Sequence, residues 1–287
     1  MNWSERQRRM LRLMGLQVWS RPEAGVTPER PHAGLATDVA VDGTTGHATE
    51  RGSVPPRASV APQAALAPAP ETLAAATPAD GADDERSRRI RTLDWTALRA
   101  AVAQCQACEL HRTRRQAVFG VGHERAHWMV VGEAPGEQED LQGEPFVGPA
   151  GQLLDRMLAA LSLTRAVDGP QPPSQRVFIA NTLKCRPPRN RNPQPAEMQA
   201  CEPFLMRQIA LVQPRIILAM GRFAIQSLLR TDAPVGKLRG QVHRYQGVPL
   251  VVTYHPAYLL RNPADKSRAW DDLCLAAQVV EEAGDPE

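Results

Sequence analysis

The sequence predicts an α/β fold built around a parallel sheet, and three observations carry this prediction. Four short apolar segments have the length and composition of buried strands. Helix-like stretches follow the first three segments promptly, which is the rhythm of strand–helix units. Three of the segments end in a polar motif. Because ligands of such sheets bind at the carboxyl ends of the strands, we expect a binding crevice there.

The predicted strands lie, in order, within HWMVVGEAPG (127–136), VFIANTLKC (177–185), IILAMG (216–221) and LVVTYHPAYLL (250–260). Glu133 follows the first apolar run, Asn181 ends the second and His255 follows the last. Parallel strands bring their carboxyl ends to one edge of a sheet. These three side chains should therefore converge, although they are far apart in the sequence.

Composition divides the 287 residues into three parts. Residues 89–287 contain every predicted strand and are long enough for one well-buried α/β domain. Residues 21–88 are rich in Ala, Pro, Gly and Thr, as in APQAALAPAPETLAAATPADGADDE. Such a stretch buries too little apolar surface to offset its ordering entropy, so we expect a disordered linker. Residues 1–20 form a separate segment at the start of this extension.

The net charge of +3 is by itself too small to indicate nucleic-acid binding, but the basic side chains are clustered. The two clusters are Arg112, Arg114 and Arg115, and then Lys184, Arg186, Arg189 and Arg191. The second adjoins Asn181 and Cys185, which favours a phosphate-contacting surface over a merely solvated loop.

The sequence has neither a secretory signal pattern nor an apolar run long enough to span a membrane. We therefore expect a cytoplasmic protein, in the bacterial cytosol or nucleoid. Its cysteines should then be reduced or metal-bound.

Four of the five cysteines have the spacing of a metal site. Cys105 and Cys108 form a C-x2-C pair, and Cys185 and Cys201 flank a loop rich in Pro and Arg. Four thiolates hold either zinc or an iron–sulfur cluster. The alternative is that Cys185 and Cys201 are small buried hydrophobes. Cys274 lies in an amphipathic run and is expected in the core.

The loop GEAPGEQED (132–140) follows the first strand and combines a tight turn with four carboxylates, Glu133, Glu137, Glu139 and Asp140, so it is either an acidic surface turn or part of a site. It lacks the spacing of a dinucleotide fingerprint and of a Walker loop, so we expect no nucleotide cofactor. Phe146 follows in EPFVGPAGQLLDRML (144–158) and is either core or a stacking surface for a flat ring.

Asn181 and His255 are the polar candidates at the ends of the second and fourth strands. An amide donates and accepts at once, as recognition of a base edge requires, although Asn at a strand end is also a common turn former. A lone His is more often structural. The position of His255 at a strand end, shortly before Leu259-Leu260-Arg261, favours catalysis.

GEAPGEQED, PFVGPAGQLL, NTLKCRPP and HPAYLLR together resemble the family 4 uracil-DNA glycosylases, the iron–sulfur branch of that superfamily. The resemblance covers about residues 90–280, and the four cysteine positions agree in order and spacing. It implies a three-layer αβα sandwich with a four-stranded, mostly parallel sheet. It also implies a monofunctional DNA repair enzyme that flips uracil out of DNA, hydrolyses its N-glycosidic bond and leaves an abasic site.

The resemblance assigns a role to each motif. Phe146 would stack on uracil, Asn181 would bond its N3–H and O4, His255 would donate to O2, and Ala134 and Pro135 would complete the pocket. Glu133 is the first candidate for orienting the attacking water, with Glu139 second or, instead, crowding C5 to exclude thymine. Leu259, Leu260 and Arg261 would form the DNA wedge, with Arg186 and Arg189 at the backbone. A structural [4Fe-4S] cluster would be held by Cys105, Cys108, Cys185 and Cys201.

Three rival interpretations remain. A covalent uracil-DNA trap on a similar sheet carries a basic K-R-R-I-H insertion, which this sequence lacks. A non-enzymatic DNA-binding protein is disfavoured because Glu133, Phe146, Asn181 and His255 are all present. A zinc-bound domain would be colourless, whereas an iron–sulfur protein absorbs visible light.

Residues 1–20 contain WSERQRRMLRLMGLQVW (3–19), with apolar residues near helical spacing. A short helix on a long linker is typical of partner docking. LMGLQVW is similar to the N-terminal peptide of the psi subunit of the bacterial clamp-loader assembly, which implies replication proteins as partners. The alternative is a helix that packs back on the domain or frays. Beyond such a partner and uracil-containing DNA, we expect a monomer that does not bind membranes.

Overall fold

The computed structural model describes residues 80–283. The predicted docking segment 1–20 and all of the predicted linker before residue 80 lie outside the described residues. Helix α2 (Asp80–Thr92) crosses the expected boundary between residues 88 and 89 and packs along α6 (Pro195–Val212). The described part of the chain contains no helix with the length and apolarity needed to cross a bilayer.

All four predicted strands are confirmed, and they form the parallel centre of one sheet. They are β2 (Trp128–Gly132), β3 (Val177–Asn181), β4 (Ile216–Met220) and β6 (Val248–Thr253). The sheet order is β1-β3-β2-β4-β6-β5, and the β3-β2, β2-β4 and β4-β6 pairs are parallel. Every residue of β2, β3 and β4 is buried, which explains why these strands have continuous apolar sequences.

The sheet has six strands, so the expected number of four was wrong. The two additional strands are β1 (Val121–Gly122) and β5 (Val242–Tyr245), both antiparallel at the edges. β1 has only two residues, which is too short for a recognisable strand pattern in the sequence. β5 forms a hairpin with β6 through Gln246 and Gly247, both at positive φ, as tight hairpin turns require.

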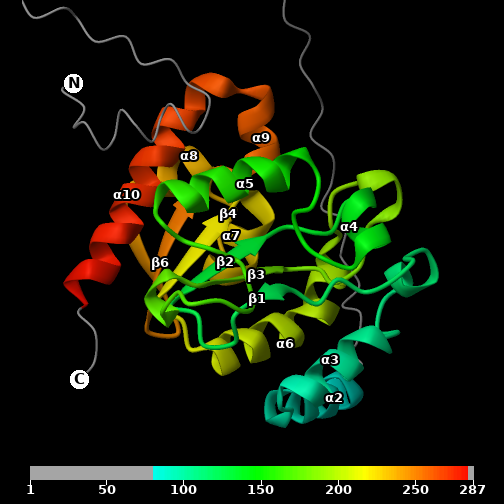
Figure 1. The fold of residues 1–287 in the computed structure, drawn as a ribbon. Helices are drawn as coiled ribbons and strands as arrows, with labels where there is room; N and C mark the ends of the chain where they lie inside the picture. The colour runs from blue at the N-terminus through cyan, green and yellow to red at the C-terminus, as the bar shows by residue number, and fades with distance from the viewer. Residues whose placement is uncertain (1–79, 284–287) are drawn as a thin grey trace, which may run out of the picture. The chain divides into compact units, whose positions relative to one another are not determined.

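Two layers of helices cover the sheet, so the predicted three-layer αβα arrangement is confirmed (Figure 1). One face packs against α3 (Trp95–Ala103), α6 and α7 (Arg222–Leu229). The other packs against α5 (Pro149–Ala160) and α10 (Lys266–Glu282). Alternate residues of each strand contribute to the two cores, such as Met129 and Val131 to the first and Val130 to the second.

The remaining elements are short helices in the segments that connect the strands and the longer helices. They are η1 (Glu109–Arg112), α4 (Glu137–Gln142), η2 (Pro173–Gln175), η3 (Pro188–Asn190), α8 (Val235–Leu238), α9 (Pro256–Arg261) and η4 (Pro263–Asp265). The predicted strand segment 250–260 therefore contains two elements. β6 ends at Thr253, and α9 begins at Pro256, so His255 lies at the junction.

Candidate active site

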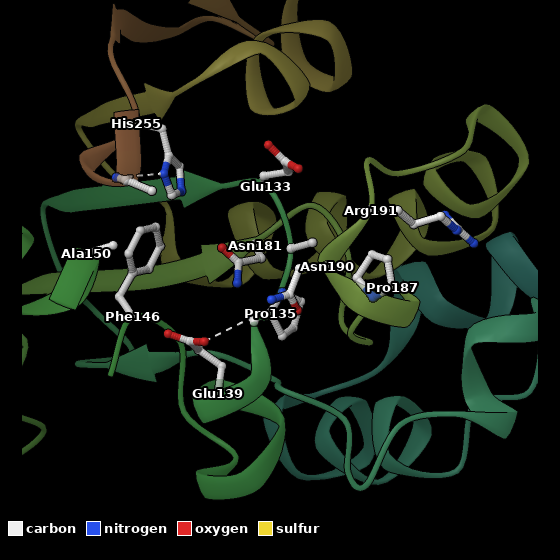
Figure 2. A pocket seen from close by; sticks show the side chains of 13 residues that line it. Glu133, Pro135, Glu139, Phe146, Ala150, Asn181, Pro187, Asn190, Arg191 and His255 are labelled. Carbon is white, nitrogen blue, oxygen red and sulfur yellow. Dashed lines mark hydrogen bonds between the residues drawn. The ribbon is translucent and has the colours of Figure 1, made fainter. Parts of the chain in front are cut away.

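A cavity of about 200 Å³ lies at the carboxyl ends of the central strands, where the sequence predicts one (Figure 2). This volume is below the ~300–1,000 Å³ of pockets for drug-sized ligands and suits one small planar ring. All seven side chains predicted to form the substrate pocket or to take part in the chemistry line it. They are Glu133, Ala134, Pro135, Glu139, Phe146, Asn181 and His255.

Glu133 and Asn181 lie together because the pairing of β2 with β3 continues beyond the strand ends. The Thr182 N–H donates to the Gly132 carbonyl at 3.0 Å, and the Leu183 N–H donates to the Glu133 carbonyl at 3.0 Å. The Thr182 hydroxyl also donates to the Glu133 carbonyl. These bonds fix the two motif loops side by side at the base of the pocket.

Gly132 allows the side chains of the pocket to approach the end of β2. A Cβ at this position would lie 2.4 Å from Asn181 Oδ1 and 2.6 Å from Phe146 Cζ. Both are far closer than real side chains tolerate. The glycine is therefore required by the pocket itself and not by a special backbone angle.

Phe146 is buried in an unusual backbone conformation, with φ at 56°. Two side chains hold its loop. The Arg165 guanidinium donates to the carbonyls of Pro145 and Phe146 at 2.8 and 2.9 Å. The Glu139 carboxylate accepts from the N–H groups of Val147 and Gly148 at 3.1 and 3.4 Å. The ring position is thus set from both sides of the loop.

Glu139 also accepts from the Gly136 N–H at 3.0 Å, so its side chain reaches back to the N-cap residue of α4. Its two oxygens together accept three backbone bonds. Glu139 therefore joins the Glu133 loop to the Phe146 loop, and its carboxylate is committed to that structural role.

Glu133 lies in the pocket wall in a poorly solvated position. Burial raises the pKa of its carboxyl group from 4.5 to about 7. A carboxyl group with a pKa near neutrality is suited to exchange or hold protons during a reaction.

His255 occupies the N-cap position of α9, where its Nδ1 accepts from the Ala257 N–H at 3.2 Å. Burial, assisted by the nearby Arg261 charge, lowers the pKa of His255 to about 4. The imidazole is therefore neutral near pH 7, and its one proton is on Nε2. Its ring lies 5.3 Å from the Phe146 ring, a direct stacking contact (Figure 2). A bound ring must then lie beside this pair, because no space separates the two.

Asn181 is 3% exposed, and its Oδ1 has no hydrogen-bond partner among the described residues. A buried acceptor without a partner costs free energy unless a ligand supplies the donor. The pocket thus offers an amide acceptor, a neutral imidazole donor, an aromatic face and a carboxyl group.

Comparison with known protein families identifies the family. A profile of the uracil DNA glycosylase superfamily matches residues 119–274, which is more than half of the chain. The chain belongs to the uracil DNA glycosylase superfamily. The predicted family resemblance is therefore confirmed.

The chain is similar to several superfamily members named type-4 uracil-DNA glycosylase. It is 41% identical over 170 residues to the one from Archaeoglobus fulgidus, covering 56% of this chain and 81% of the relative. It is 40% identical over 193 residues to that from Pyrobaculum aerophilum, covering 64% and 93%. It is 43% identical over 171 residues to that from Saccharolobus solfataricus, covering 56% and 75%.

The four predicted metal-ligating cysteines of this superfamily member lie near one another, with Cys185 and Cys201 buried. Burial raises the pKa of Cys108, Cys185 and Cys201, and the proximity of Cys105 to each of these three thiols adds to the effect. N–H groups point at three of the sulfurs. Arg86 donates to Cys105 at 3.5 Å, Arg114 to Cys185 at 2.9 Å and the Lys184 backbone to Cys201 at 3.2 Å.

Among residues 80–283, no three Cys, His, Asp or Glu side chains are grouped closely enough to hold one metal ion. Zinc needs four sulfurs about 2.3 Å from a single centre. A four-iron cluster distributes its thiolates over four irons, so their sulfurs lie further apart. The four cysteines, three of them with N–H donors at their sulfurs, have the donor chemistry that either group requires.

The structure corrects two predictions about surface residues. Lys184 is 1% exposed and donates to the Asn181 carbonyl at 2.7 Å and to Gln208 Oε1 at 2.6 Å. It supports the pocket from inside and cannot contact phosphate. Leu259 is 0% exposed because it packs in the core between the sheet and α5. Of the predicted wedge, only Leu260, at 44% exposure, and Arg261 reach the surface.

Arg186 and Arg189 lie in the loop that leads from Cys185 past the pocket. Arg186 donates to Asn190 Oδ1 at 2.8 Å and pairs with Glu137 at 3.7 Å. Arg189 is exposed and has a positive φ.

Sequence reasoning missed several residues of the wall: Gly136, Ala150, Pro187, Asn190 and Ala257, while Arg191 was expected only as a surface cation. The prolines of CRPPRNRNP were the signal that this loop turns back over the crevice.

Proposed function

We propose that this protein is a DNA repair enzyme that removes uracil from DNA. It hydrolyses the N-glycosidic bond, releases free uracil and leaves an abasic site. The observation that carries the proposal is the pocket, which is lined by a neutral histidine, an amide whose oxygen has no partner among the described residues, and an aromatic ring. Membership of the uracil DNA glycosylase superfamily supports the same conclusion.

The pocket is too small and too buried to admit a base that remains in a duplex, so the uracil nucleotide must leave the stack. Phe146 then supplies a face for the ring. Asn181 Oδ1 accepts from uracil N3–H, and its Nδ2 donates to O4. Cytosine presents the opposite groups at these two positions, so the same amide orientation rejects it.

His255 donates its Nε2–H to uracil O2, where negative charge develops as the bond to the sugar breaks. The backbone bond at Nδ1 fixes this tautomer, and the low pKa keeps the imidazole neutral. One such preorganised donor contributes about 3–4 kcal/mol of transition-state stabilisation.

Glu133 orients the attacking water and stabilises the cationic sugar. Of the two candidates, Glu139 has its oxygens occupied by three backbone N–H groups, which favours Glu133 for this role. Ala134 and Pro135 complete the wall beside it.

The finer features extend this proposal to the whole domain. Cys105, Cys108, Cys185 and Cys201 hold a [4Fe-4S] cluster with a structural role, which binds the Arg-rich loop to the domain. Leu260 and Arg261 enter the space that the extruded nucleotide leaves, and Arg186 and Arg189 contact the DNA backbone. The protein acts as a monomer in the cytoplasm. Residues 1–20, which lie outside the described residues, dock on replication proteins.

The decisive experiment measures release of free uracil from a labelled uracil-containing oligonucleotide, with protein purified without chelators. We expect release by the wild type and a loss of about 100-fold or more in His255→Ala. No release by a folded, coloured wild type would contradict the proposal. A denaturing gel would then separate a covalent DNA adduct from simple binding.

The docking proposal has a separate test. Deleting residues 1–20 should abolish capture of clamp-loader components and leave uracil release unchanged. Equal capture by the full-length and shortened proteins would contradict docking through this segment.

A further inference from the structure

A second cavity, of about 710 Å³, adjoins the uracil pocket and has no role in the chemistry described so far. The two cavities share the lining residues Glu133, Ala134, Asn190, His255 and Ala257, so they lie side by side. The remaining walls come from the loop after β6, from α8 and α9, and from the first residue of α7. A chain that enters the uracil pocket therefore passes this second space.

One wall of the cavity is a rigid aromatic pair. The rings of Tyr254 and Tyr258 stack with centroids 5.0 Å apart and planes 19° apart. The Tyr258 hydroxyl donates to Asp265 at 2.7 Å, and the Arg239 guanidinium lies 5.9 Å from the Tyr254 ring. Both rings are only partly buried. Their orientation is fixed before any ligand arrives.

The cavity is also cationic. Arg222 at the start of α7 and Arg261 at the end of α9 line it, and both are exposed. Among the described residues of its walls, only Glu133 is acidic, and that carboxyl group belongs to the shared boundary. Fixed aromatic faces beside exposed arginines are the features by which proteins bind single-stranded nucleic acid without reading its sequence.

We propose that this cavity binds the nucleotide next to the extruded uracil on the same DNA strand. Its base packs against the Tyr254–Tyr258 pair and its phosphate contacts Arg222. The inference rests on the proposed function, because it assigns the flanking nucleotide of that same substrate. It predicts that full activity requires a nucleotide on one particular side of the uracil, and that the base of this nucleotide is unpaired when it is bound.

The test uses single-stranded oligonucleotides in which the base on the 5′ or the 3′ side of the uracil is replaced by an abasic spacer. For the wild type, removal of the base on one side should lower kcat/KM about tenfold, equivalent to about 1.4 kcal/mol. Tyr258→Leu should have a kcat/KM about tenfold below that of the wild type on the intact substrate. Replacing the neighbouring base by the spacer should then lower its kcat/KM no further. Tyr258→Phe, which keeps the ring, should behave as the wild type does.

Arg222→Gln provides a second variant that leaves the aromatic wall unchanged. It should lower kcat/KM at low salt and reduce the slope of log kcat/KM against log salt by about one. Arg125→Gln is the matched control, because Arg125 is equally exposed but lies before β2, at the opposite end of the strand, and should keep the wild-type slope.

Equal wild-type rates with the spacer on either side would overturn the inference, as would a Tyr258→Leu enzyme that remains fully sensitive to it. A salt slope in Arg222→Gln equal to that of the wild type would contradict the proposed contact between Arg222 and the phosphate. These results differ from failure of the proposed function, in which the wild type releases no uracil from any substrate.

Discussion

At the residue scale, one physical cause prepares two groups of the pocket in opposite ways. Exclusion of water disfavours charge, so it raises the pKa of Glu133 to about 7 and lowers the pKa of His255 to about 4. The histidine is consequently a constant neutral donor, whereas the carboxyl group titrates near physiological pH. Only one of the two can give the enzyme a pH dependence near neutrality.

We therefore expect kcat/KM to rise with pH through a midpoint near 7, because the carboxylate form of Glu133 is the active one. Glu133→Gln should lower the rate and remove this transition. His255→Gln should lower the rate at every pH without moving the midpoint. Initial rates of uracil release across the pH range measure this, and a midpoint near 4.5 would contradict it.

The same pKa shift predicts a stability effect of defined sign. The folded state holds the Glu133 proton up to about pH 7, whereas the unfolded chain releases it near 4.5. The contribution to folding is therefore fully present below pH 4.5 and is lost as pH rises through 7. Thermal unfolding should show that Glu133→Gln gains stability relative to the wild type above pH 7. If Glu133→Gln and the wild type differed in Tm by the same amount below pH 4.5 as above pH 7, this explanation would be contradicted.

Single residues also mark the limit of sequence reasoning. Glu133, Asn181 and His255 were predictable because each belongs to a motif at a strand end, and Phe146 because it lies in the Gly- and Pro-rich loop that leads into α5. The burial of Lys184 was not, since a lysine within a basic run resembles a surface residue until its tertiary partners are known.

At the scale of elements, the Phe146 loop depends on partners that lie outside the loop, on either side of it in the sequence. Arg165 follows α5, whereas Glu139 lies in α4, and both bond the backbone of the same loop. Neither partnership leaves a local pattern. A loop with a residue at positive φ needs such support to remain in one conformation.

We expect Arg165→Met to lower kcat/KM by about 10- to 100-fold, because the Phe146 ring would no longer be held in position to stack on the uracil ring. Arg165→Lys, which can bond one carbonyl, should recover part of the loss. Arg156→Met is the control, since Arg156 is exposed on α5 and does not line the pocket. Tm should change little in all three, and a wild-type rate in Arg165→Met would exclude this role.

The strands show which elements a sequence can reveal. Continuous apolar runs predicted the four central strands, because burial on both faces imposes that composition. The edge strands β1 and β5 depend on pairing with a neighbour, so their own residues carry little signal. The position of His255 at the end of the last strand is confirmed, but helix α9 was missed because Pro256 begins it within the same segment.

At the scale of the whole molecule, the cysteine site connects segments on both sides of the first core. Cys105 and Cys108 follow α3, Cys185 follows β3, and Cys201 lies in α6. A group bound by all four would hold the first helices against the sheet. Fold class and cysteine spacing were predictable from sequence, but the N–H donors around the sulfurs required the structure.

Cys201→Ser should therefore lose visible absorbance and lower Tm by roughly 10 °C, since each kcal/mol corresponds to about 2–4 °C in a domain of this size. Cys274→Ser is the matched control, because Cys274 lies in α10, on the opposite face of the sheet. It should retain both the colour and the Tm. Loss of colour in both variants would show that the cluster is not held by the predicted set.

Helix α9 has a consequence for how the enzyme searches DNA. Its six residues begin directly after His255 and end with Leu260 and Arg261, which face the surface. Leu259 anchors the helix in the core, which holds its two ends in a defined relative position. In the proposed function, entry of Leu260 and Arg261 into the duplex would therefore be coupled to presentation of the His255 imidazole to a base. A site that resists the exposed end of α9 would then not reach the imidazole.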